Sequence, residues 1–244
     1  MTIIGISGSQ TADRDPGFEA CPLATVNNNY VQSVQRAGGL PLILPVLEDC
    51  DVEAAAKLYI EQIDGLILSG GHDLNPLDYG QEPLEKLQEI WPERDRFDRA
   101  LLEAALAAEK PILGICRGFQ LINAYFGASY LQDLSYSPKP LLKHVQDALP
   151  WHLTHSVEYR ESSFFAAIFG TKSLVNSFHH LVFFEPGSGL EAVGYSPDGV
   201  LEAVEDLSRG IVACQFHPEM CWRHHDSMLE IFRRFIAIAA EARG

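Results

Sequence analysis

Residues 114–118 read Gly-Ile-Cys-Arg-Gly, with an apolar run before the cysteine and an amphipathic run after the second glycine. This order predicts a nucleophile elbow, in which a strand turns sharply into a helix. Gly114 and Gly118 fit such a turn, because a Cβ beside the nucleophile would clash in the strained backbone. The following helix would direct its N-terminal dipole at Cys116, which favours a thiolate. The pattern therefore predicts a nucleophile at Cys116, with a buried structural cysteine as the alternative.

A candidate general base lies far downstream, in the segment Gln-Phe-His-Pro-Glu at 215–219, directly after another apolar run. A thiol nucleophile needs a base, and the base needs an acceptor that orients it. Pro218 biases His217 towards an extended backbone, in which residues i and i+2 point to the same side. We therefore expect Glu219 to lie beside His217 and to hold the imidazole in one tautomer.

A third motif is the Gly70-Gly71 pair that ends the apolar run 65–68. Without side chains, the backbone N–H groups of these residues can approach a ligand closely. Together with the N–H of Arg117, directly after the candidate nucleophile, they could form an oxyanion hole. A plain turn is the alternative for this pair.

The three motifs together resemble the class I (triad) glutamine amidotransferase-like superfamily, and within it the γ-glutamyl-γ-aminobutyrate hydrolase branch (peptidase C26). The branch pattern SGGxDxxPxxYGxxP is matched by residues 69–83. Further matches are ERD at 93–95, GICRGxQxxN at 114–123, NSxHH at 176–180, DGxxE at 198–202 and QxHPE at 215–219. The matches follow the expected order over nearly the whole chain.

The resemblance implies a three-layer α/β/α sandwich with a central, mostly parallel sheet, as in class I amidotransferase and flavodoxin-like folds. It implies hydrolysis of a γ-glutamyl amide through a thioester on Cys116, with His217 and Glu219 completing the catalytic triad. Gln120 resembles the glutamine that helps to hold the glutamyl head group, and His179 or His180 would border the pocket. Such chemistry needs no metal or organic cofactor, only the small-molecule substrate and water.

Two alternatives stay open: a glutaminase subunit that delivers ammonia to a separate synthase, and a non-catalytic binding protein on the same scaffold. The leaving amine is also open, although the resemblance suggests γ-aminobutyrate and thus polyamine catabolism. The chain departs from the branch pattern at Ala128-Ser129, where two glycines are usual, and at Leu181, where glutamine is usual. Both departures lie where the leaving group should bind, so they bear on substrate choice.

Composition narrows the possible partners. The chain has 244 residues and a formal net charge of 18 − 33 = −15, which disfavours nucleic acid and anionic membranes as partners. Five cysteines without paired spacing indicate a reducing compartment, and we find neither a signal peptide nor a long apolar span. We therefore expect a cytoplasmic protein with one domain over 1–244, which could form a homodimer.

Apolar runs alternate with helical patterns along the first half, which favours a parallel sheet covered on both faces. Strands are expected at 3–7, 40–46, 65–68 and 111–115, and a hairpin joins 190–194 to 200–204. Helices are expected around 30–37, at 52–60 after the capping Asp51, at 96–108 and at 228–240. His144, His152 and His155 lack the spacing of a tetrahedral zinc site, so we interpret them as surface or substrate-loop residues.

Overall fold

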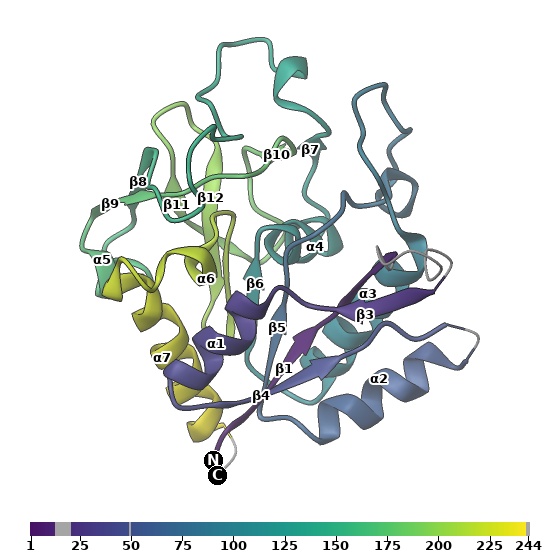
Figure 1. The fold of residues 1–244 in the computed structure, drawn as a ribbon. Helices are drawn as coiled ribbons and strands as arrows, with labels where there is room; N and C mark the ends of the chain where they lie inside the picture. Colours follow the sequence, from purple (N-terminus) through teal and green to yellow (C-terminus); the bar gives the residue numbers. More distant parts are fainter. Residues whose placement is uncertain (13–20, 49, 243–244) are drawn as a thin grey trace.

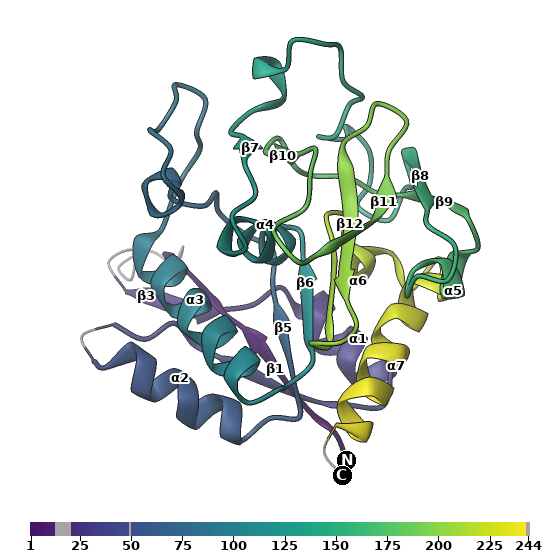
Figure 2. The same cartoon turned by 180° about the vertical axis from the view of Figure 1, so that it is seen from behind.

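The computed structural model describes residues 1–12, 21–48 and 50–242. Within these residues, one sheet has nine strands in the order β4-β1-β5-β6-β13-β12-β11-β8-β9. Helices cover both faces of this sheet (Figures 1 and 2). The predicted α/β/α arrangement is therefore confirmed.

The parallel part of the sheet contains the strands that lead into the three motifs. Its strands are β4 (Leu40–Leu44), β1 (Ile3–Ser7), β5 (Gly65–Leu68), β6 (Ile112–Ile115) and β13 (Ile211–Cys214), each parallel to its neighbour. The three strands β5, β6 and β13 are buried along their whole length, as expected for strands covered on both faces. Their carboxyl ends meet at one edge, which is where ligands bind in open α/β sheets.

The second part of the sheet is antiparallel and comes mostly from the C-terminal half of the chain. It consists of β12 (Leu201–Asp206), β11 (Glu191–Tyr195), β8 (His155–Tyr159) and β9 (Lys172–Val175). Two small ribbons lie outside the main sheet, β7 (Tyr130–Leu131) with β10 (Val182–Phe183) and β2 (Ser9–Ala12) with β3 (Pro22–Thr25). The predicted hairpin is present as β11 and β12.

Each face of the sheet has its own hydrophobic core under its own helices. One face carries α1 (Asn28–Arg36), α5 (Ala166–Phe169), α6 (Pro218–Cys221) and α7 (Asp226–Glu241). The other carries α2 (Val52–Glu61), α3 (Pro92–Ala107) and α4 (Arg117–Tyr125), and short 3-10 turns lie at η1 (Pro76–Tyr79) and η2 (Leu134–Tyr136). Figure 1 shows α1 and α7 side by side, and Figure 2 shows α2 and α3 on the opposite face.

Helix boundaries follow local chemistry. Asp51 caps α2 as expected, because its Oδ1 accepts a hydrogen bond from the Ala54 amide at 2.9 Å. Helix α3 begins at Pro92 rather than at the expected Arg96, since proline is favoured at the first helical position, where no N–H donor is needed. Within the described ranges, none of the helices has both the length and the apolar character needed to cross a bilayer.

Candidate active site

Cys116 occupies the turn between β6 and α4 with φ 52° and ψ −103°. A positive φ is costly for a residue with a Cβ, and such strain is concentrated at functional sites. The turn is held from both sides: the Cys116 amide donates to the Cys214 carbonyl at 2.9 Å, and the Gln120 amide donates to the Cys116 carbonyl at 3.0 Å. The elbow predicted from the sequence is therefore present, and it holds the Cys116 backbone in one conformation.

The two glycines of the elbow are required by packing between three elements. A Cβ on Gly118 would lie 2.1 Å from the Leu68 carbonyl oxygen at the end of β5. A Cβ on Gly114 would lie 2.6 Å from Ile122 and 2.9 Å from the Gly118 backbone. Helix α4 can therefore cross directly over β5 and β6 only when both positions lack a side chain.

His217 and Glu219 lie side by side, with His217 Nδ1 2.6 Å from Glu219 Oε1. The local backbone differs from the extended segment that we expected, because Pro218 begins the short helix α6 and Glu219 belongs to its first turn. Proline at the first helical position explains that early start. Asn176 fixes the His217 main chain: its Oδ1 accepts from the His217 amide at 2.9 Å, and its Nδ2 donates to the His217 carbonyl at 3.1 Å.

The charge state of His217 is set by its neighbours. Burial disfavours the imidazolium and lowers its pKa, but Glu219 and then Cys116 favour the charged form more strongly. The pKa of His217 is therefore raised well above its usual range. Because Nδ1 of His217 faces Glu219, the other ring nitrogen is available to Cys116. The side-chain hydrogen bond with Cys116 also raises the pKa of His217. The arrangement can hold a thiolate beside an imidazolium.

The Gly70-Gly71 pair follows β5 and lies against Cys116 and His217. A Cβ on Gly70 would be 3.0 Å from His217 Cε1 and 3.6 Å from Cys116 Cβ. The Gly70 amide is already engaged, because it donates to the Tyr30 hydroxyl at 2.9 Å. Across the described part of the chain, the Gly71 amide has no hydrogen-bond acceptor. Gly71 is therefore the better placed of the two to donate to an oxyanion.

Arg117 contributes to the site in two ways. As the first residue of α4, its amide has no acceptor within the helix, so it is free for an oxyanion. Its side chain is buried and pairs with the carboxylates of Asp95 and Asp98. This pairing joins α4 to α3, so the elbow is anchored at both its backbone and its side chain.

Arg94 extends the same buried network to the glycine loop. Its guanidinium donates to the Gly70 carbonyl at 2.9 Å and to Ser69 Oγ at 3.0 Å, and its Nε lies 3.4 Å from Asp98. Burial, and then repulsion from Arg117, lower the pKa of Arg94 to about 10. A Cβ on Gly71, whose φ is +154°, would collide with Arg94 Nη1 at 1.9 Å. The sequence match at 93–95 marked these residues but did not reveal that they support the loop.

The three residues predicted to bind substrate have different surroundings. Gln120 is buried, and its Nε2 lies 3.4 Å from Gln215 Oε1. His180 lies between two carboxylates, with Nε2 2.9 Å from Asp73 Oδ1 and Nδ1 3.1 Å from Asp133 Oδ2. The hydrogen bond with Asp73 is the main reason that the pKa of His180 is raised. His180 thus joins the loop after β5 to the loop before η2.

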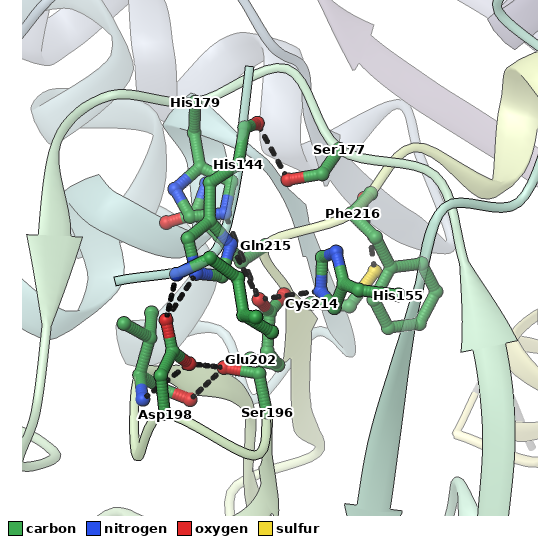
Figure 3. A network of polar contacts seen from close by, with 12 residues as sticks. His144, His155, Ser177, His179, Ser196, Asp198, Glu202, Cys214, Gln215 and Phe216 are labelled. Carbon is green, nitrogen blue, oxygen red and sulfur yellow. Dashed lines mark hydrogen bonds and ion pairs between the residues drawn. The ribbon is translucent and has the colours of Figure 1, made fainter. Parts of the chain in front are cut away.

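His179 points elsewhere, into a buried group of histidines around Glu202 that also contains His144 and His155 (Figure 3). The interpretation of His144 and His155 as surface or substrate-loop residues is therefore wrong, since their exposed fractions are 0% and 8%. His155 is the first residue of β8, whose alternate residues face the core, and this alternation could have indicated its burial. His152 is exposed, as that interpretation requires.

The pKa values within this group are set by burial and by the neighbouring side chains. Burial raises the pKa of Glu202, but the neighbouring histidines, His144 first, lower it well below its usual range. Burial lowers the pKa of His179. Although burial raises the pKa of Asp198, hydrogen bonds that begin with the one from Ser196 lower it to about 2. Both carboxylates are therefore ionised.

Comparison with known proteins identifies the family. The family model of peptidase C26 matches residues 2–219. The chain therefore belongs to the peptidase C26 family, within the glutamine amidotransferase-like superfamily.

Individual relatives and solved structures agree with this assignment. The glutamine amidotransferase-like protein YvdE of Lactococcus lactis is 38% identical over 238 residues, covering 96% of this chain and 98% of that protein. The γ-glutamyl-γ-aminobutyrate hydrolase PuuD of Escherichia coli K12 is 30% identical over 223 residues, covering 87% and 85%. The glutaminase domain of Trypanosoma brucei CTPS, solved with bound acivicin, shares the fold with a TM-score of 0.63 at 18% identity, covering 99% and 94%.

Proposed function

We propose that the protein hydrolyses γ-glutamyl amide bonds through a γ-glutamyl thioester on Cys116. One observation carries the proposal. Cys116 is held at a positive φ at the end of β6, and Gly70 packs against both this residue and His217, whose ring is oriented by Glu219 at 2.6 Å. Cys116, His217 and Glu219 thus lie at one edge of the sheet, and they are the residue types that acyl transfer needs as nucleophile, base and orienting carboxylate.

Acylation begins when the Cys116 thiolate attacks the γ-carbonyl carbon and forms the C–S bond. The oxyanion that develops accepts hydrogen bonds from the amides of Gly71 and Arg117. Loss of one such donor costs roughly 3 kcal/mol in other acyl-transfer enzymes. When the intermediate collapses, the C–N bond breaks and the His217 imidazolium gives its proton to the leaving amine.

Deacylation uses the same groups in the opposite direction. Neutral His217 takes a proton from water as the oxygen attacks the thioester carbonyl. The C–S bond then breaks and releases glutamate, and the thiolate–imidazolium pair is restored. Glu219 keeps the imidazole in one tautomer through both steps.

For the substrate, we propose γ-glutamyl-γ-aminobutyrate or a related γ-glutamyl amine, which would place the enzyme in polyamine catabolism. The similarity to PuuD of Escherichia coli supports this substrate class. Gln120 would hold the glutamyl head group. Asp73 lies two residues after Gly71, and the charged group that it forms with His180 and Asp133 would face the leaving amine. Leu181 would bear on the choice of that amine.

A glutaminase subunit that supplies ammonia to a synthase is the second candidate. The similarity to the glutamine amidotransferase-like protein of Lactococcus lactis favours it. The chemistry at Cys116 would be the same, with ammonia as the leaving group. The two functions therefore differ only in the preferred substrate and in the need for a partner protein.

The deciding experiment measures glutamate release from γ-glutamyl-γ-aminobutyrate and from glutamine side by side. We expect fast release from the former, slow release from glutamine, and no turnover by Cys116→Ala. Cys50→Ala, which removes an exposed cysteine, is the matched control and should keep full activity. Preference for glutamine would favour the glutaminase subunit, and activity retained in Cys116→Ala would refute the nucleophile.

A further inference from the structure

Glu202 is fully buried near the start of β12, and three imidazole rings surround its carboxylate (Figure 3). Its Oε1 lies 3.3 Å from His144 Nδ1, 3.7 Å from His179 Nε2 and 3.0 Å from His155 Nε2. The rings come from the loop before β8, from the segment after β9 and from β8 itself. Three separate segments therefore meet at one carboxylate that the proposed reaction does not use.

The outer hydrogen bonds of two rings fix where their protons lie. His144 Nε2 is 3.0 Å from Asp198 Oδ2, and His179 Nδ1 is 3.0 Å from the Leu181 carbonyl oxygen. Both partners are acceptors, so the proton of each neutral ring lies on this outer nitrogen. The inner nitrogens, His144 Nδ1 and His179 Nε2, then carry lone pairs.

These inner nitrogens face a third acceptor. Both are buried without a hydrogen-bond partner, and both point to the Glu202 carboxylate. Three acceptors that converge in a buried site repel one another unless a positive species lies between them. An extra proton on His144 would let its Nδ1 donate a hydrogen bond to Glu202, but His179 Nε2 would still have no partner. A cation satisfies all three donor atoms.

The charges of the group agree with a divalent ion. Glu202 is fully buried on one side of the His144 ring, and on the other side Asp198 accepts hydrogen bonds from the Leu142 amide at 2.7 Å and the Ser196 hydroxyl at 2.6 Å. Neutral imidazoles do not balance these charges, and a buried unpaired carboxylate is costly. An ion of charge +2 beside Glu202 offsets the charge of this carboxylate.

We propose that His144, His179 and Glu202 bind a divalent transition-metal ion, with Zn²⁺ as the reference ion. Their ligand atoms lie within 4.8 Å of one another. Zn²⁺ binds imidazole nitrogen and carboxylate oxygen at roughly 2.0–2.2 Å, so tetrahedral ligands lie roughly 3.3–3.6 Å apart. The observed 3.3 and 3.7 Å separations from Glu202 Oε1 are close to this spacing. Water would complete the coordination.

The outer contacts are those that metal-binding histidines make. Such a ring usually donates its second N–H to a carboxylate or a backbone carbonyl, as His144 does to Asp198 and His179 does to Leu181. His155 has a different task, because its Nε2 donates to Glu202 Oε1 at 3.0 Å and so orients the carboxylate. Inner and outer contacts therefore both fit a metal site.

The proposed metal site supports the segment that leads from β13 to His217. The Gln215 amide donates to the Glu202 carbonyl at 2.8 Å, and His217 follows two residues later. A bound ion would join the loop that carries His144, the segment that carries His179, and β12. Its role is to hold these segments together next to β13, and it goes beyond the hydrolysis proposed above.

The test begins with the full-length protein stripped of metal by a chelator and checked for folding by circular dichroism. Titration calorimetry with Zn²⁺ and absorption spectroscopy with Co²⁺ should both show one ion per chain, with Co²⁺ giving the visible bands of tetrahedral coordination. His144→Ala and Glu202→Gln should weaken binding at least 100-fold. His152→Ala removes an exposed histidine of the same loop and should bind as the wild type does.

If a variant of a ligand residue does not fold, the position of the ion in the wild-type protein still tests the proposal. Anomalous diffraction at the zinc edge from wild-type crystals should place the ion between His144, His179 and Glu202. The proposal is overturned if the folded, stripped protein takes up neither ion. It is also overturned if the ion binds elsewhere or binds Glu202→Gln with unchanged affinity. Because these readouts measure metal, they are independent of the proposed amide hydrolysis.

Discussion

His217 Nδ1 and Glu219 Oε1 are 2.6 Å apart, and both residues are buried beside Cys116. The pair is formed within three consecutive residues, at the point where β13 ends and α6 begins. Because Pro218 begins the helix, the carboxylate and the imidazole are brought together by local backbone geometry. The orientation of the proposed base therefore depends on one short segment.

Replacement of Glu219 by glutamine should lower kcat by roughly 10²–10⁴-fold, because the imidazole loses its orienting anion and can adopt the wrong tautomer. It should also shift the pH profile. Glu219 favours the imidazolium and raises the pKa of His217, so the neutral amide should let this pKa fall. The alkaline limb of kcat, where His217 loses its proton, should then move to lower pH. Glutamate release measured across pH tests both effects.

Glu161→Gln provides the control, because Glu161 is exposed and far in sequence from the site. Its rate and its pH profile should match those of the wild type. A Glu219→Gln protein with the wild-type alkaline limb would contradict the role assigned to this carboxylate.

Tyr30→Phe should reduce the free energy of unfolding by about 1–3 kcal/mol, because it leaves the half-buried Gly70 amide without an acceptor. Burial, and then the charge of Glu219, raise the pKa of Tyr30 well above its usual range, so its hydroxyl stays neutral. Tyr136→Phe is a matched control, since its hydroxyl accepts from the Lys86 amide at 3.0 Å in an exposed place where water can substitute. Urea unfolding of both variants measures the difference. Equal losses would show that the partial burial of the Gly70 amide is not the cause.

The sequence indicated those features that are set by neighbours along the chain. Apolar runs predicted β1, β5 and β6, and the elbow at Cys116 follows from residues 114–118 with the apolar run before them and the amphipathic run after them. The pairing of His217 with Glu219 was also local. Strand and elbow patterns could be found because their physical causes lie within a few residues.

Features that depend on the sheet order could not be found in this way. Asn176 contacts His217 across 41 positions, and Arg94 contacts Gly70 across 24. The histidines around Glu202 meet because β8 and β12 both flank β11, an order that no local pattern encodes. Their loop-like sequence surroundings therefore gave the wrong interpretation of His144 and His155. The proposed homodimer and the cytoplasmic location stay predictions.

Gly118→Ala should destabilise the protein by roughly 3 kcal/mol or more, because the new Cβ would lie 2.1 Å from the Leu68 carbonyl oxygen, a backbone atom that cannot turn aside. Gly127→Ala is the comparison: its φ is +84° but nothing lies within 4 Å of the new Cβ. We expect it to cost about 1–2 kcal/mol from backbone strain alone. Urea unfolding of the two variants separates packing from strain, and a milder effect at Gly118 would refute the packing argument.

Asn176→Ala should affect both stability and turnover. The side chain bonds to the His217 amide and carbonyl and also donates to the Pro150 carbonyl at 2.8 Å, so its loss leaves the buried His217 amide without an acceptor and takes one donor from each carbonyl. We expect destabilisation of about 2–5 kcal/mol. Because Asn176 fixes the main chain of His217, kcat should fall by roughly 10–100-fold with little change in KM.

Gln146→Ala separates these two effects of the Asn176 change. Gln146 is another buried amide in the same region, and it bonds to the carbonyls of Leu149 and His152 and to the Ser177 amide without touching His217. The Gln146 change should lower the free energy of unfolding by a similar amount. At a temperature well below the unfolding midpoints of both variants, its kcat should stay near the wild-type value. If both variants lose kcat equally, a general loosening of the structure around Asn176 and Gln146 explains the loss. If only Asn176→Ala loses it, the hydrogen bonds to the His217 backbone set the position of the base.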